Sequence, residues 1–303
     1  MKKILVVYYT QSGQLKTIVD KILSPLSQNN TYTIDYFKIE PIDDFPFPWT
    51  NDTFYDCMPE SVEGITIPVK AFDKQDDYDL VILAYQVWFL SLSIPFWSML
   101  QDKKLKALLN HNNVITILGI RNMWVNAQKR LLNYFKENNV NHVGNLVFTD
   151  PNSNIISVIT VLKFLTTGKK KPYKNLPPYG ITKQKLETLT KFGELMELSL
   201  NTNNWSGFQE GVVKNKGVSL KFSIKTTEMA AGRIFKLWAA FIRKKGGPGN
   251  PDRRVRLKIY EYYLLFLIFF ISPISSSIFS LVGIIFYPLA KKDMNRILLM
   301  QQK

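Results

Sequence analysis

The sequence contains very little cysteine and histidine. Of 303 residues, Cys57 is the only cysteine, and His111 and His142 are the only histidines. A single cysteine excludes an internal disulfide framework, and it gives no indication of an oxidising compartment. The two histidines lie apart from any cluster of cysteines or carboxylates with metal-ligand spacing, so we expect no metal site.

Acidic residues are scarce in one half of the chain. Residues 1–150 carry 14 Lys+Arg and 16 Asp+Glu, whereas residues 151–303 carry 25 Lys+Arg and 8 Asp+Glu. The formal net charge of +15 therefore arises in the second half. Such asymmetry is not typical of a uniformly basic nucleic-acid binder, and we expect no nucleic-acid partner.

Apolar segments alternate between strand and helix patterns along the first two thirds of the chain. Continuous or alternating apolar runs predict strands at 4–9, 31–39, 80–84, 114–118 and 143–148. Patterns with the helical period predict helices at 14–26, after Pro95, at 123–138 and at 182–200. The short run after Lys2 lacks the length and cleavage site of a signal peptide, so we do not expect export.

This alternation predicts an α/β fold, a doubly wound parallel five-stranded sheet. Residues 41–64, which are rich in proline, aspartate and aromatic side chains, are interpreted as an irregular insertion at the edge of the sheet. We predict one domain over residues 1–204 and a basic C-terminal region over residues 205–303.

The loop after the first strand has the composition of a phosphate site. Unpaired backbone N–H groups and the helix dipole favour an anion there, and Gly13 permits an unusual turn. The alternative is a turn that only caps the first helix. The loop consists of Thr10, Gln11, Ser12, Gly13 and Gln14, followed by Leu15.

This loop resembles that of flavodoxins and flavodoxin-like quinone reductases, whose motif is roughly T-x-[ST]-G-x-[ST]. Thr10, Ser12, Gly13 and Gln14 match the motif, but Leu15 replaces its last hydroxyl. The resemblance implies FMN as the cofactor, with its phosphate in this loop.

The same resemblance places the flavin ring between the loops after the third and fourth strands. Trp88 would supply an aromatic wall, and Arg121 with Asn122 would supply donors to the ring. The alternatives are ordinary packing for Trp88 and a surface salt bridge for Arg121. The complete set of expected ring contacts is Tyr85, Gln86, Val87, Trp88, Phe89, Gly119, Arg121, Asn122 and Trp124.

A long uncharged segment with basic flanks lies near the C-terminus. Residues 262–290 contain no charged side chain, which suits a bilayer, and an amphipathic basic helix is expected at 229–245. Because Pro273 interrupts the segment, we expect a re-entrant hairpin within residues 260–290. A single kinked span and a buried dimerisation segment of a homodimer are the alternatives. Residues 155–166 either dip into the membrane similarly or cover the active site.

Taken whole, the chain resembles the dialkylresorcinol condensing enzymes of bacterial flexirubin and aryl-polyene pigment pathways. Residues 4–15, the loop 121–124 and the hydrophobic tail carry this resemblance. It implies an FMN-dependent aromatase that dehydrogenates a lipid-like 2,5-dialkylcyclohexane-1,3-dione, made by a partner ketosynthase, to a 2,5-dialkylresorcinol. It also implies membrane lipid as a partner and a location on the cytoplasmic face of the inner membrane.

Roles for individual residues follow from this resemblance. Arg121 would hold the enolate oxygen of the substrate. Tyr85 is the candidate base, and Trp124 would border an alkyl channel. Two other functions stay open: a membrane-associated NAD(P)H:quinone reductase and a non-enzymatic flavodoxin-like scaffold. The sequence leaves the alkyl chain lengths and the electron acceptor undetermined.

Overall fold

Five strands form one parallel sheet at the centre of the molecule. The computed structural model describes residues 1–75, 77–171, 173 and 175–301. The strands lie in the order β2-β1-β3-β6-β7 and every neighbouring pair is parallel. This is the flavodoxin-like, doubly wound order, so the predicted fold class and all five strands are confirmed. Their bounds are β1 Lys2–Tyr8, β2 Tyr32–Lys38, β3 Leu80–Tyr85, β6 Asn113–Ile120 and β7 Asn141–Thr149.

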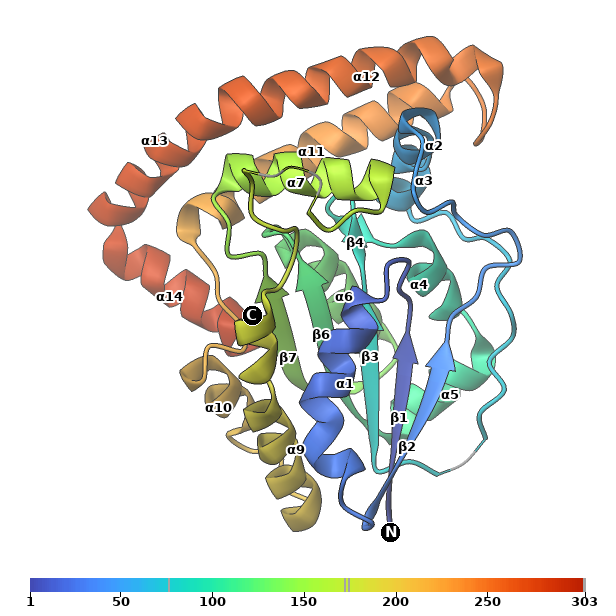
Figure 1. Cartoon of the computed structure of the whole chain (residues 1–303), viewed down its shortest axis with the longest axis vertical. Helices are drawn as coiled ribbons and strands as arrows, with labels where there is room; N and C mark the ends of the chain where they lie inside the picture. The colour runs from blue at the N-terminus through green and yellow to red at the C-terminus, as the bar shows by residue number, and fades with distance from the viewer. Residues whose placement is uncertain (76, 172, 174, 302–303) are drawn as a thin grey trace.

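Helices cover both faces of the sheet (Figure 1). Helices α1 (Gln14–Ser27) and α9 (Thr190–Thr202) lie on one face, and α4 (Ile94–Met99), α5 (Lys103–His111) and α6 (Val125–Glu137) lie on the other. All six residues of β3 are buried, which explains why its sequence is a continuous apolar run. Helix α10 (Phe208–Lys214) packs beside β7.

The predicted helix at 182–200 is two helices, α8 (Lys183–Glu187) and α9. Its predicted cap is confirmed, because the Thr182 hydroxyl accepts a hydrogen bond from the Lys185 N–H at 3.2 Å. The insertion at 41–64 is more regular than expected. It contains α2 (Asn51–Asp56) and α3 (Met58–Glu63), while the loop after β3 forms a small hairpin of β4 (Val87–Trp88) and β5 (Ser91–Leu92).

A layer of helices lies across the carboxyl ends of the strands (Figure 1). It is formed by α7 (Asn154–Thr167), α11 (Phe222–Arg243), α12 (Arg254–Phe266) and α13 (Ser272–Ile285), and α14 (Tyr287–Leu298) then returns toward β7. The helix predicted at 229–245 therefore exists as α11, which begins earlier than expected, and residues 155–166 lie within α7. Because α11 packs on α3 and α6, the two predicted regions share contacts, and the division at residue 204 stays a prediction.

The predicted re-entrant hairpin at Pro273 is wrong. The chain stays helical through a five-residue π turn (η2, Leu267–Ile271) and Pro273, and it turns only near Phe286. The π turn directly before the proline accommodates its ring and its missing N–H. The serines that follow donate to carbonyls within the helix, Ser275 to Ser272 at 3.1 Å and Ser277 to Pro273 at 3.0 Å, so they do not break it.

Candidate functional site

The loop after β1 presents an open helix N-terminus. Gly13 has φ +76° and a Cβ added there would meet nothing within 4 Å. The first turn of α1 contains no acidic side chain that could occupy the positive end of the helix dipole. Leu15 is buried in the core, and the Thr17 hydroxyl donates to the Gly13 carbonyl at 3.1 Å. Neither side chain replaces the missing motif hydroxyl, so an anion here would rely on backbone N–H groups, Thr10 and Ser12.

Buried polar atoms without partners gather on the loops that follow β1, β3 and β6. Thr10 Oγ1, Gln11 Nε2, Gln86 Oε1, Asn122 Oδ1 and Trp124 Nε1 are all buried, and none has a hydrogen-bond partner within the described part of the chain. Unpaired buried polar atoms cost free energy, and such a group at a functional site is commonly satisfied by a ligand. These residues therefore fit a polar, flat ligand such as FMN. The individual contacts of the predicted site stay predictions.

Aromatic side chains stand beside the first loop. The ring of Trp88 packs against Tyr9, Phe45 and Trp49, with ring centroids at 5.8, 5.0 and 5.5 Å. Trp49 Nε1 donates to Gln11 Oε1 at 3.3 Å, which ties this aromatic cluster to the loop. Phe45 and Trp49 are not among the site residues predicted from the sequence. Their signal was the aromatic, proline-rich run at 45–49, which was interpreted only as an edge insertion.

Arg121 lies in a polar group at the carboxyl end of β6. Its Nη1 donates to Asn154 Oδ1 at 2.6 Å, and Asn122 Nδ2 donates to the same oxygen at 2.8 Å. Burial lowers the pKa of Arg121 to about 10, and the nearby charges of Asp150 and Tyr179 only partly oppose this effect. No ion pair to Arg121 is found among the described residues. A half-buried cation of this kind can bind an anionic oxygen. Asn154 was missed because it lies in another segment, at the start of α7.

An apolar chamber of about 350 Å³ opens directly beside Arg121. Its walls come from α7, α11, α12, η2 and α13, with Phe54 from α2, Phe89 from the hairpin after β3 and Met123 from the loop after β6. A mostly apolar cavity with a few polar groups is the usual form of a site for an apolar ligand. Residues 155–166, which belong to α7, cover this chamber. The side chains of α7 and α11 that line it include Val158, Val161, Leu162, Leu165, Ala230, Ala231, Ile234 and Phe235.

Two predicted roles are not supported by the positions of the side chains. Tyr85 is fully buried, stacks on Phe96 at 4.8 Å and donates to Gln128 Oε1. Burial raises the pKa of Tyr85 well above its ordinary value, so it is unsuited to act as a base. Trp124 is also fully buried and does not line the chamber, where Met123 is found instead.

A buried carboxylate of α11 caps helix α6, and it too was missed from the sequence. Glu228 is 0% exposed and accepts hydrogen bonds from the Val125 N–H at 3.1 Å and the Asn126 N–H at 2.7 Å. The side chain of Trp124, the N-cap residue of α6, makes no capping hydrogen bond itself. Burial raises the pKa of Glu228 to about 7, although the N–H groups of α6 oppose the shift. Glu228 therefore connects the C-terminal layer to the loop that carries Arg121.

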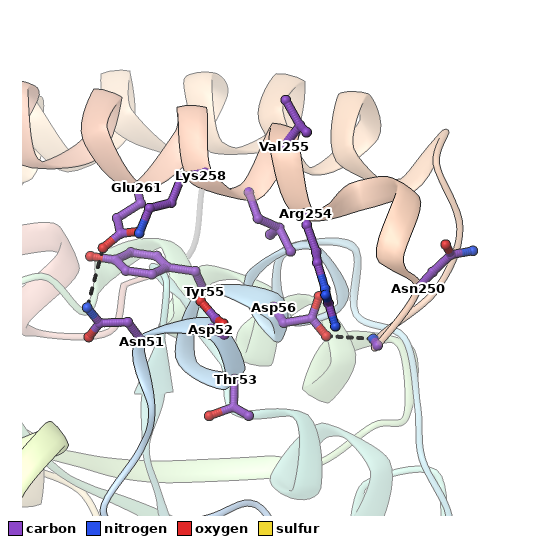
Figure 2. A pocket seen from close by; sticks show the side chains of 12 residues that line it. Asn51, Asp52, Thr53, Tyr55, Asp56, Asn250, Arg254, Val255, Lys258 and Glu261 are labelled. Carbon is purple, nitrogen blue, oxygen red and sulfur yellow. Dashed lines mark hydrogen bonds and ion pairs between the residues drawn. The ribbon is translucent and has the colours of Figure 1, made fainter.

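A second cavity, of about 490 Å³, lies between α2 and the beginning of α12 (Figure 2). Its lining carries charges of both signs, including Asp56 and Arg254. Asn51 and Glu261 point toward one another across it, and Asn51 Nδ2 donates to Glu261 Oε1 at 3.5 Å. We interpret this cavity as part of the packing interface between α2 and α12.

No protein-family model and no curated protein matches the sequence. Solved structures with a similar chain path include a flavoprotein described as putative from Bacteroides eggerthii, with 14% identity, 54% of this chain and 98% of that chain covered, and a TM-score of 0.38. A flavoprotein in complex with FMN from Lactobacillus acidophilus has 18% identity, coverage of 48% and 93%, and a TM-score of 0.35. Oxidised flavodoxin 1 from Bacillus cereus has 12% identity, coverage of 64% and 95%, and a TM-score of 0.34. The fold assignment rests on the strand order.

Proposed function

We propose that this chain is an FMN-dependent oxidoreductase that acts on a lipid-like substrate. The observation that carries the proposal is a group of buried polar atoms on three loops, next to the open N-terminus of α1, for which the described residues offer no hydrogen-bond partner. Thr10, Ser12 and the N–H groups around Gly13 would hold the phosphate, and Asn122 would face the polar edge of the ring. Trp88, within its aromatic cluster, would form one wall of the site for the flat ligand.

The reaction we propose is the aromatisation of a 2,5-dialkylcyclohexane-1,3-dione to a 2,5-dialkylresorcinol. The ring loses two hydrogens, one as a hydride and one as a proton released to solvent. Bound FMN would supply the two-electron acceptor for the hydride. Arg121 would hold the enolate oxygen of the dione by a charge-assisted hydrogen bond, and Asn154 fixes the position of its guanidinium.

The apolar chamber supports this choice of substrate class. It begins at Arg121 and continues between α7 and α13, so a polar ring at the arginine would place an alkyl substituent among apolar side chains. A reductase that accepts only small, polar quinones would not need this space. A ketosynthase that makes the dione, and a position on the cytoplasmic face of the inner membrane, belong to the same proposal.

Anaerobic mixing tests the reaction. The purified protein, loaded with FMN in detergent, is mixed with a 2,5-dialkylcyclohexane-1,3-dione, and the flavin absorbance near 450 nm is followed. We expect bleaching by the dione with formation of the resorcinol, and no bleaching by cyclohexane-1,3-dione without alkyl groups at the same concentration. Bleaching by NAD(P)H alone, with the dione inert, would establish the quinone reductase instead. Protein that neither binds FMN nor reacts would leave the scaffold function.

A further inference from the structure

A single stripe of exposed apolar side chains runs along the whole outer side of α12, η2 and α13. Its members recur every three or four residues, which places them on one face of a continuous helix. The exposed fractions range from 51% to 71% in this set. The stripe, called here the outer face, consists of Val255, Ile259, Tyr262, Phe266, Phe270, Ile274, Ile278, Leu281 and Ile285.

The opposite side of the same helix is occupied by the protein itself. Leu257 and Tyr260 are buried against α2, α3 and α11, and Leu264, Ile268 and Phe279 line the apolar chamber. The helix is therefore apolar on two sides, and only one side is covered. An uncovered apolar surface of this extent normally marks a contact with a membrane or a partner.

Both ends of the helix are fixed to the same folded body. At its beginning Arg253 is fully buried and pairs with Glu60 at 2.9 Å and with Asp56 at 2.9 Å, while Arg243 pairs with Glu60 at 2.6 Å. Beyond the other end, α14 returns to the domain, where the Leu298 carbonyl accepts from Gln209 Nε2 at 2.6 Å. Figure 1 shows the helix lying across the layer formed by α7 and α11.

This geometry decides between crossing a membrane and lying on it. The helical stretch from Pro251 to Ile285 is the one segment among the described residues that is long and apolar enough to cross a bilayer. Its 35 residues extend about 50 Å, well beyond the roughly 30 Å of hydrocarbon. Since both ends are attached to one domain, crossing would draw charged parts of that domain into the hydrocarbon. A helix lying in the plane of the interface avoids this cost.

Exposed cations border the outer face. Lys258 lies on α12 itself, with its Nζ 5.4 Å from the ring centroid of Tyr262, and Lys291 and Lys292 follow the far end of α13. Exposed cations beside an apolar face are typical of a surface that binds anionic lipid headgroups. A second copy of this chain would instead bring these like charges together, which disfavours a dimer through this face.

We infer that the outer face of α12–α13 docks flat on a bilayer that contains anionic phospholipid, without crossing it. One side of the helix then contacts lipid while the other forms the wall of the chamber. For the proposed function, on which this last step rests, an alkyl-bearing substrate reaches Arg121 from the bilayer past a single helix. The docking itself does not depend on FMN.

Vesicle flotation tests the docking. The full-length protein is mixed with vesicles of phosphatidylcholine, with or without 30% phosphatidylglycerol, and floated at low and high salt. We expect co-flotation that is stronger with phosphatidylglycerol and is weakened by salt. Phe270→Glu with Ile278→Glu should reduce the bound fraction at least tenfold. Ile42→Glu changes a side chain of similar exposure, 61%, outside the outer face and should bind like the wild type. Equal binding by all variants would overturn the inference.

Depth measurements separate a flat helix from a span. In a Cys57→Ala background, a single cysteine replaces Tyr262, Phe270 or Ile278, and each variant is labelled with a fluorophore at that cysteine. The fluorescence is then quenched by lipids that carry a spin label at defined depths. A flat helix predicts the same depth at all three positions. A depth that changes steadily along the series would mean that the helix crosses the bilayer. Vesicle-independent dimerisation that the outer-face variants abolish would assign this face to a second copy. Flotation without FMN binding would leave the docking intact and refute the proposed function alone.

Discussion

The replacement Glu228→Gln tests the connection between the C-terminal layer and the loop at Arg121. Glu228 is fully buried, and its two oxygens accept from the N–H groups of Val125 and Asn126, at the beginning of α6. Glutamine keeps the volume but offers one acceptor oxygen, so one of these N–H groups loses its partner. Loss of a helix cap costs about 1 kcal/mol, to which an unsatisfied buried N–H adds a similar amount.

The stronger signature of this variant is its pH dependence. The folded carboxyl keeps its proton up to about pH 7, whereas the unfolded one loses it near the ordinary glutamate pKa of 4.5. The folded protein therefore binds more protons between these values, and the wild type loses stability as pH rises through this window. The shift corresponds to about 3 kcal/mol. The variant lacks this contribution, so its disadvantage relative to the wild type should shrink as pH rises from 5 to 8.

Urea unfolding followed by tryptophan fluorescence, in detergent at several pH values, measures both free energies of unfolding. We expect the difference between wild type and Glu228→Gln to fall by about 2 to 3 kcal/mol across the window. A difference that is constant, or that grows with pH, would refute the assignment of a raised pKa to this carboxyl.

Three further variants test other contacts. Glu60→Gln should lower the free energy of unfolding by roughly 3 kcal/mol, because Arg253 stays buried but keeps only one of its two carboxylate partners. Adding Arg253→Met to the same chain should recover part of the loss. Ala231→Trp should fill the chamber and remove turnover of long-chain diones while FMN binding persists, whereas Ala240→Trp, on the exposed side of α11, should not. Arg121→Met should lower the rate of flavin bleaching by the dione roughly 100-fold, with FMN affinity changed much less; an unchanged rate would exclude Arg121 from the reaction.

The sequence was sufficient for the sheet and for the positions of the loops around the site. Each strand is buried on both faces, so its apolar run is continuous and local. The prediction of a phosphate site also needs only neighbours in sequence, a strand end, Gly13 and the beginning of α1. Since parallel strands end at one edge, the loops after β1, β3 and β6 could be brought together without the structure.

The features that the sequence did not predict depend on contacts between distant segments of the chain. Nothing local in the sequence shows that Glu228 caps α6 or that Asn154 holds Arg121. Glu228 lies 102 residues after Asn126, and Asn154 lies 33 residues after Arg121. Pro273 predicted a break because the π turn that accommodates it has no clear sequence signal. Tyr85 was placed at the site by its position at a strand end, but its side chain points into the core and pairs with Gln128.

The replacement Thr10→Val tests whether the loop after β1 binds FMN. Among the residues that the structure describes, the Thr10 hydroxyl is buried without a partner, so valine should leave the stability of the flavin-free protein unchanged or slightly higher. A lost hydrogen bond to a phosphate costs roughly 1.5 to 3 kcal/mol, so the dissociation constant for FMN should rise about tenfold to 150-fold. Fluorescence titration of the flavin-free protein with FMN measures this, with Ser27→Ala, an exposed hydroxyl at the end of α1, as the control. Tight binding to the wild type and the control but not to Thr10→Val is the predicted result. Folded wild-type protein that does not bind FMN, or equal affinity in all three proteins, would show that this loop is not an FMN site.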